Sequence, residues 1–236
     1  MLLEVQNVTK RFGGFLALGA VNLRVRQGER FGLIGPNGSG KTTLINCISG
    51  TLKTDAGRIV FGGQEITALP AHRRTRLGIA RSFQIPKPFV SMTVLQNLMI
   101  PVEYSGRGLR AGALDEAMSV LKLMGLAAKA HVPSAALTQI EMRKLELARA
   151  MAARPRLLVS DEAMAGLSSA EADDILAILF ELNHRGVTII MIEHIMRAVM
   201  RFSERIAVLD AGEKIAEGGP DEILANPRVE KAYLGE

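Results

Sequence analysis

The residues with the clearest chemical pattern form one glycine-rich run. Eight consecutive residues fit the pattern G-x-x-x-x-G-K-[ST]: Gly35, Pro36, Asn37, Gly38, Ser39, Gly40, Lys41 and Thr42. Glycines in such a run let successive backbone N–H groups turn towards phosphate oxygens at the start of a helix, where the helix dipole favours negative charge. The ammonium of Lys41 adds a charge for the β- and γ-phosphates, and the Thr42 hydroxyl can bind Mg²⁺. The run therefore predicts a site for a nucleoside triphosphate.

Two adjacent acids supply the second half of such a site. Asp161 and Glu162 follow the apolar run 157–159. Taken alone, an apolar run that ends in Asp-Glu is usually a strand that enters a loop. Beside a phosphate-binding loop, we interpret Asp161 as the group that holds magnesium, directly or through water. Glu162 is then placed to polarise the water that attacks the γ-phosphate.

The elements that must position these residues alternate between strands and helices. Residues 21–25 alternate apolar and polar side chains, which is typical of a half-buried strand, and 31–34 form a second strand before the glycine-rich run. A helix is expected over about 41–49, with Gly50 in a stopping position. A hairpin is expected from 58–61 and 64–66, further strands at 157–159 and 187–192, and a late hairpin within 206–215.

A helical stretch interrupts this alternation. From about 86 to 137 the strand pattern fades, and 92–99 and 114–124 have helical spacing. Further on, Ser168 with Glu171 forms a capping box that starts another helix. We therefore expect an α/β core with an inserted helical subdomain at approximately 86–137. No internal repeat or low-complexity linker is evident, so we expect one compact unit.

Composition limits the class of protein. The chain has 236 residues, a net charge of +5 and a pI near 9.6, with 48% hydrophobic, 22% charged and 4% aromatic residues. These values are ordinary for a folded globular protein rather than a disordered chain. The positive charge suits an anionic ligand, an acidic lipid surface or nucleic acid without choosing among them. A single cysteine, Cys47, excludes an intramolecular disulfide and is expected in the core. The longest apolar runs, such as 187–192, are too short to cross a bilayer, and no secretory signal is visible, so a membrane role would be peripheral.

With both halves of the site placed, the chain resembles the nucleotide-binding subunits of ABC transporters along nearly its whole length. The resemblance implies one nucleotide-binding domain over 1–236: a P-loop NTPase core with a mixed sheet flanked by helices, an antiparallel β subdomain and the inserted helical subdomain. It implies that Phe12 stacks on adenine and that Thr43 joins the nucleotide site. It also implies that Gln84 senses magnesium and the attacking water, and that His194 contacts the γ-phosphate. Taken alone, Phe12 and His194 would more often be structural residues.

A narrower resemblance concerns the transporter subgroup. The segments 77–84, 92–94, 97–98, 166–167, 192–194 and 226–236 look like those of the ATPases of branched-chain amino-acid importers. This implies an ATPase that couples Mg²⁺ and ATP to transport, in the cytoplasm on the inner face of the cell membrane. The implied partners are membrane-spanning permease subunits and a second ATPase subunit, as a heterodimer or a homodimer. Nothing in such a subunit contacts the transported substrate.

The sequence departs from the family at the signature L-S-G-G-Q. The corresponding residues are Leu137, Thr138, Gln139, Ile140 and Glu141. The resemblance implies that this loop crosses a dimer interface and binds the γ-phosphate held by the partner subunit. Thr138 keeps a hydroxyl for that contact, but both glycines and the glutamine are absent. The same residues form a capping box, T-x-x-E, so the helix start is expected to survive while its hold on phosphate weakens. We therefore favour a heterodimer, in which a partner with the usual signature completes this chain's own site.

Two other functions remain open on the sequence alone. One is a regulatory or scaffold module that binds ATP with little hydrolysis, which the altered signature favours. The other is a nucleic-acid-associated ABC ATPase. The small number of aromatic residues and the absence of a Lys/Arg-rich tail argue against this function. No [NT]-K-x-D motif is present, which argues against a GTPase. We expect no nucleic-acid partner.

Overall fold

The computed structural model describes residues 1–83, 86–104 and 112–234. Six strands form a sheet in the order β10-β9-β3-β8-β7-β6, with all pairs parallel except β9 and β10. Their bounds are β3 Arg30–Ile34, β6 Ile79–Ser82, β7 Leu157–Asp161, β8 Thr188–Ile192, β9 Arg205–Asp210 and β10 Glu213–Gly218. Because the carboxyl ends of parallel strands meet at one edge, the segments that follow β3, β7 and β8 lie together there. This mixed sheet confirms the expected fold class and the strands expected at 31–34, 157–159, 187–192 and 206–215.

A second sheet is antiparallel, in the order β2-β1-β4-β5. Its strands are β1 Leu3–Phe12, β2 Phe15–Val25, β4 Ala56–Phe61 and β5 Gln64–Glu65. The expected hairpin is β4–β5, and the strand expected at 21–25 is the end of the longer β2. Strand β1 carries no regular alternation over its length because bulges interrupt its pairing with both neighbours, so the pattern did not reveal it.

Helix α1 (Lys41–Ser49) lies between the two sheets and matches the helix expected from the sequence. Its apolar residues, Cys47 included, share one buried cluster with both sheets. Burial raises the pKa of Cys47 to about 11, as expected for a core thiol. The side chains of β8 alternate between two clusters: Ile190 and Ile192 face α1, whereas Ile189 and Met191 face the helices on the other side. The six-stranded sheet is thus buried on both faces.

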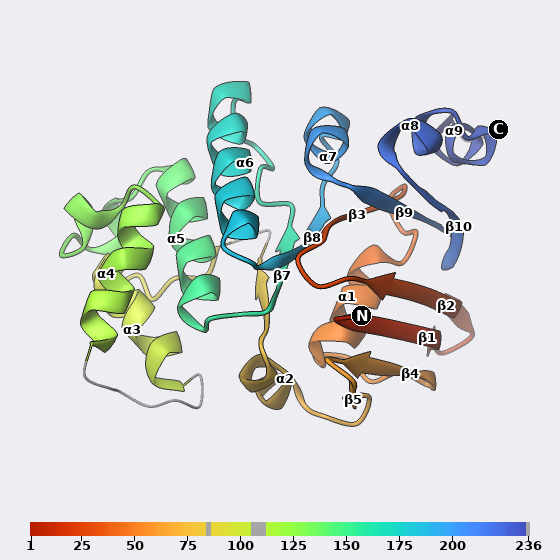
Figure 1. Cartoon of the computed structure of the whole chain (residues 1–236), viewed down its shortest axis with the longest axis horizontal. Helices are drawn as coiled ribbons and strands as arrows, with labels where there is room; N and C mark the ends of the chain where they lie inside the picture. Colours follow the sequence, from red (N-terminus) through yellow and green to blue (C-terminus); the bar gives the residue numbers. More distant parts are fainter. Residues whose placement is uncertain (84–85, 105–111, 235–236) are drawn as a thin grey trace.

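The remaining helices surround the sheets, and most of them cover the other face of the six-stranded sheet and one end of the molecule. They are α2 Ala71–Leu77, α3 Val94–Tyr104, α4 Ala113–Leu123, α5 Gln139–Ala152, α6 Ser169–His184, α7 Met196–Phe202, α8 Pro220–Leu224 and α9 Pro227–Leu234, with short 3₁₀ helices at Ala127–Lys129 and Ser134–Ala136. Figure 1 shows α3, α4 and α5 grouped at the end opposite to the antiparallel sheet. The helices expected at 92–99 and 114–124 are α3 and α4. Within the described residues, no helix combines the length and apolar character needed to cross a bilayer.

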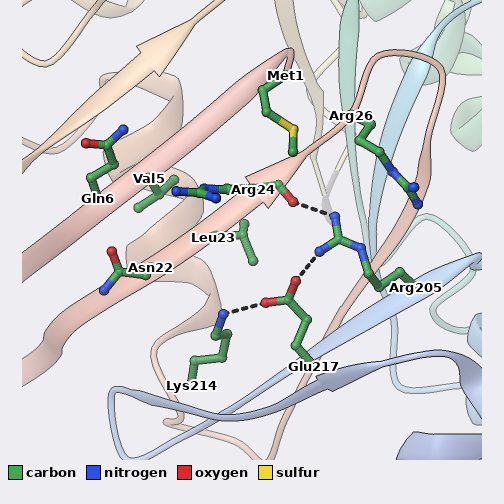
Figure 2. A pocket seen from close by; sticks show the side chains of 10 residues that line it. All are labelled: Met1, Val5, Gln6, Asn22, Leu23, Arg24, Arg26, Arg205, Lys214 and Glu217. Carbon is green, nitrogen blue, oxygen red and sulfur yellow. Dashed lines mark hydrogen bonds and ion pairs between the residues drawn. The ribbon is translucent and has the colours of Figure 1, made fainter.

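A hollow of about 670 Å³ lies where β1 and β2 meet the hairpin β9–β10 (Figure 2). Arg205 dominates its wall: it donates to the backbone oxygen of Arg24 at 2.6 Å and bonds Glu217. Arg205 also donates to the buried carboxylate of Glu29 at 2.9 Å, and Lys214 pairs with Glu217. Since these charges bond one another, we interpret the network as the junction that fixes the antiparallel sheet to the hairpin.

Candidate nucleotide site

The glycine-rich run forms the loop between β3 and α1. Inside it, the Lys41 ammonium donates to the backbone oxygens of Gly35 at 2.7 Å and Pro36 at 2.9 Å. Lys41 is 6% exposed, and its pKa is lowered because burial disfavours the charged form, although Glu162 and Asp161 oppose that effect. The loop carbonyls therefore hold this cation at the position from which it can meet a phosphate group.

Two of the glycines are required by close contacts of the backbone. At Gly35, where φ is 149°, a Cβ atom would lie 2.0 Å from the backbone oxygen of Leu209. At Gly40, where φ is 101°, a Cβ would lie 2.7 Å from the backbone oxygen of Ala17. Both positions combine a conformation that favours glycine with a collision for any larger residue. The loop thus depends on glycine at its first and sixth positions.

The two acids lie at the end of strand β7, as the sequence indicates: the first ends the strand and the second follows it. Asp161 is the last residue of the strand and is 6% exposed. Glu162 has a φ of 47°, a conformation that non-glycine residues rarely adopt, and its N–H donates to Ile192 at 2.9 Å. Its carboxylate Oε1 lies 3.2 Å from Nε2 of His194, which follows β8. The strained backbone turns Glu162 towards the glycine-rich loop and away from the strand direction.

Lys41, Glu162 and His194 line one hollow of about 290 Å³, whereas Asp161 is not among the residues that line it. It is lined by Phe12, Phe15, Ala17, Asn37, Gly38, Ser39, Gly40, Lys41, Thr42, Thr43, Glu162 and His194. The structure thereby brings together the predicted aromatic residue, most of the glycine-rich loop, and the predicted acid and histidine. Gly35 and Pro36 do not line the hollow, but their backbone oxygens accept the hydrogen bonds from Lys41. A cleft that joins a loop of backbone N–H groups to a carboxylate and an imidazole can hold a triphosphate and activate water beside it.

Sequence reasoning missed a second aromatic residue at this hollow. Phe12 and Phe15 pair across the hairpin that joins β1 to β2 through Gly13 and Gly14. Both rings are exposed, 50% and 65% respectively, so neither belongs to the core. The signal was present, because two glycines between two strands are typical of a tight hairpin that sets its flanking residues side by side.

The residues fit a magnesium ion by the chemistry of their donors. Magnesium is usually held by one or two protein oxygens together with substrate phosphates. Thr42 and Asp161 offer a hydroxyl and a carboxylate, and the described residues contain no cluster of three or more His, Cys, Asp or Glu that would favour another metal. Gln84, the third predicted metal contact, lies outside the described residues. When bound, magnesium would neutralise charge on the phosphates.

The altered signature begins helix α5. Thr138 accepts from the Glu141 N–H at 3.4 Å, and Glu141 accepts from the Thr138 N–H at 3.0 Å. The capping box predicted from T-x-x-E is thereby confirmed. Lys129 pairs with Glu141, and this bond, together with the bond from Thr138, lowers the pKa of Glu141. Ile140 is half-buried and packs on the core, whereas Thr138 is exposed and does not line the hollow described above.

A buried carboxylate supports the turn that follows Glu162. Glu193, 3% exposed, accepts a hydrogen bond from the Met164 N–H at 2.9 Å. On α5, Arg143 donates to the backbone oxygen of Ala165 at 3.0 Å. Burial raises the pKa of Glu193 to about 7, with the nearby charge of Glu162 adding to the effect. The turn is therefore held from both sides, next to the pair of Glu162 and His194.

Comparison with known proteins identifies the class of this fold and site. The family model described as ABC transporter matches residues 18–165, which is more than half of the chain. A second model, described as Branched-chain amino acid ATP-binding cassette transporter, matches residues 213–236. The chain belongs to the ABC transporter family and is an ATPase of that family, as the sequence indicated.

Among particular relatives, the chain is 39% identical to the high-affinity branched-chain amino acid transport ATP-binding protein BraF of Pseudomonas aeruginosa, covering 100% of this chain and 98% of the relative. It is also 39% identical to LivG of Escherichia coli over the same shares. A crystal structure of the ADP conformation of an ABC transporter cassette matches with a TM-score of 0.92 and 34% identity, covering 100% and 99% of the two chains. A dimeric bacterial cassette matches with a TM-score of 0.84 and 28% identity, covering 93% and 99%.

Proposed function

We propose that this chain binds Mg²⁺ and ATP in the hollow between the glycine-rich loop and His194, and hydrolyses ATP to drive an importer. The observation that carries the proposal is the convergence of Lys41, Glu162 and His194 on one cleft from three strand ends. In this cleft the loop N–H groups and Lys41 hold the phosphates, and Glu162 accepts a proton from the attacking water. His194, held beside Glu162, faces the same phosphate end.

Removing the lysine tests the binding site directly. We expect Lys41→Ala to abolish measurable binding of Mg-ATP by titration calorimetry, because the variant loses the one cation enclosed by the loop. Lys53→Ala, which removes an exposed lysine beyond α1, is the matched control and should bind as the wild type does. Undiminished affinity for Mg-ATP in Lys41→Ala would contradict the proposed site.

We further propose that the working ATPase is a heterodimer with a subunit that has an ordinary signature. Gln139 and Ile140 replace glycines where the backbone would approach the partner's phosphate, and Glu141 brings a negative charge, although it is paired with Lys129. Losing one preorganised donor to a developing anion typically costs about 10²–10³ in rate. A pure homodimer of this chain should accordingly hydrolyse ATP slowly, and full homodimer activity would contradict the heterodimer.

Restoring the signature is the sharper test of the same idea. The triple change Gln139→Gly, Ile140→Gly and Glu141→Gln should raise the turnover of the isolated chain. Thr138 stays unchanged, so the helix keeps its capping hydroxyl. Met142→Leu, next to the signature and on the same helix, is the matched control and should leave turnover unchanged. Equal turnover in the restored and original chains would favour the second candidate, a module that binds ATP with little hydrolysis.

The proposed transport substrate is a branched-chain amino acid, carried by membrane-spanning partners of this chain. Its support is the full-length similarity to BraF and LivG and the match at 213–236. A groove of about 250 Å³ between α2, β6 and the helices α3 and α5 is a candidate contact for those partners. Cells that produce Lys41→Ala in place of this chain should lose uptake of labelled leucine, isoleucine and valine. Unchanged uptake of all three amino acids would contradict the proposal that this chain drives the import of branched-chain amino acids.

A further inference from the structure

A single arginine spans the two halves of the candidate metal site. Arg81, on β6, donates through Nη2 to Oδ2 of Asp161 at 2.7 Å. Through Nη1 it donates to Oδ1 of Asn46 at 2.6 Å. The side chains of Arg81 and Asp161 are only 11% and 8% exposed, so water screens their attraction weakly. The guanidinium therefore bonds one residue of β7 and one of α1 at the same time.

Its two partners belong to the elements that carry the candidate magnesium ligands. Asn46 lies on α1, four residues after Thr42 and therefore one turn further along the same helix. Asp161 ends β7, which pairs with β6 so that Arg81 is opposite Val159. The path from Thr42 along α1 to Asn46, then through Arg81 to Asp161, is continuous. It connects the hydroxyl and the carboxylate that would bind one ion.

We propose that Arg81 is a positioning residue that sets the spacing between Thr42 and Asp161 and thereby favours magnesium over larger divalent cations. The inference depends on the proposed nucleotide site. An arginine suits the task because its planar guanidinium presents several donors in a fixed geometry, whereas a lysine presents a single flexible ammonium. Asp161 bonds Arg81 through Oδ2, so its other oxygen would remain available to the metal.

Metal selectivity distinguishes positioning from a general effect of charge or stability. Magnesium demands nearly ideal octahedral geometry, whereas calcium accepts variable numbers of ligands at longer distances. Arg81→Lys keeps the positive charge but loses the pair of hydrogen bonds that the guanidinium donates to Asn46 and Asp161 at the same time. Asn46→Ala removes the other end of the bridge without changing any charge. Both variants should therefore weaken binding that depends on magnesium more than binding that depends on calcium.

The experiment titrates a non-hydrolysable ATP analogue into the full chain at stepped concentrations of Mg²⁺ or Ca²⁺, and in EDTA. Each variant should raise the half-saturating Mg²⁺ concentration about tenfold, the lower end of what the loss of a group that orients a metal ligand costs. The half-saturating Ca²⁺ concentration and the affinity in EDTA should change less than twofold. The double variant should lose no more than the worse single variant, because both changes break the same bridge.

Arg30→Lys is the matched control. Arg30 also joins an asparagine and a carboxylate, with Nη1 3.2 Å from Asn183 Oδ1 and Nη2 3.0 Å from Glu204 Oε1, but it begins β3 at the end away from the glycine-rich loop. The Arg30→Lys variant should leave the Mg²⁺ and Ca²⁺ titrations unchanged. Unchanged magnesium dependence in Arg81→Lys and Asn46→Ala, or equal losses with magnesium and calcium, would overturn the role of Arg81. A wild-type chain whose nucleotide binding ignores magnesium would overturn the proposed site as well.

Discussion

The imidazole Nε2 of His194 lies 3.2 Å from the carboxylate Oε1 of Glu162. The two residues follow different strands, β8 and β7, which are neighbours in the sheet. Glu162 also has a strained backbone, and the contact holds its side chain in the hollow that the glycine-rich loop lines. The pair is therefore the part of the site most directly open to tests of hydrolysis.

Replacing the acid separates hydrolysis from binding. Glu162→Gln keeps the volume of the side chain but removes its ability to accept a proton, so ATP turnover should fall by about 10²–10⁴. Affinity for Mg-ATP should stay within a few-fold of the wild type. Phosphate release, measured at saturating ATP, checks the first value, and calorimetry checks the second. Glu181→Gln, on the exposed part of α6, is the control, and turnover retained in Glu162→Gln would contradict the assigned base.

The β1–β2 hairpin that carries Phe12 and Phe15 should recognise the base of ATP and not its phosphates. Phe12→Ala should weaken ATP binding by about 1–3 kcal/mol, the range for stacking of a base on an aromatic ring. Binding of inorganic triphosphate should stay the same, because that ligand has no base. Displacement of a fluorescent nucleotide by each ligand measures both effects, and Phe15→Ala tests the second ring. Phe89→Ala removes an exposed ring far along the chain, and an equal loss there would count against this assignment.

The capping box at the altered signature should contribute to stability. Thr138→Ala should lower the free energy of unfolding by about 0.5–2 kcal/mol, because a backbone N–H at the start of α5 loses its acceptor. Thr138→Ser should cost less, since it keeps the hydroxyl. Urea titrations give both values. Ser168→Ala removes the same kind of cap from α6 and should cost a similar amount; no loss in Thr138→Ala would mean that the cap is energetically idle.

The buried Glu193 should make stability depend on pH. Its pKa of about 7 in the folded chain exceeds the ordinary value of 4.5 for a glutamate, so between these pH values the folded state binds a proton that the unfolded state has lost. The free energy of unfolding should therefore decrease as pH rises from about 4.5 to 7, by roughly 1–3 kcal/mol, and then level off. Glu193→Gln can still accept from Met164 and should lack this decrease. Parallel pH profiles for the two proteins in urea titrations would refute the effect.

Much of the candidate site could be predicted from the sequence because its residues are close together in the chain. The glycine-rich loop, Lys41 and Thr42 follow one another in the chain, so their placement needs only a strand, a tight loop and a helix. The capping boxes at Thr138 and Ser168 likewise depend on residues three positions apart. A pattern confined to one turn of a helix can be recognised wherever it occurs. The roles assigned to the individual site residues remain predictions until variants test them.

The sequence by itself predicted which residues bind phosphate, and it determined that Asp161 ends a strand and that α5 and α6 begin with a cap. Only the tertiary structure decided that Arg81 bonds Asp161 and Asn46, which are 80 and 35 residues away in the chain, and that Glu193 supports the turn after Glu162. The physical reason is that those contacts follow from the order of strands in the sheet and the position of α1 against it. That order minimises exposed apolar surface over the whole chain, and no short segment encodes it.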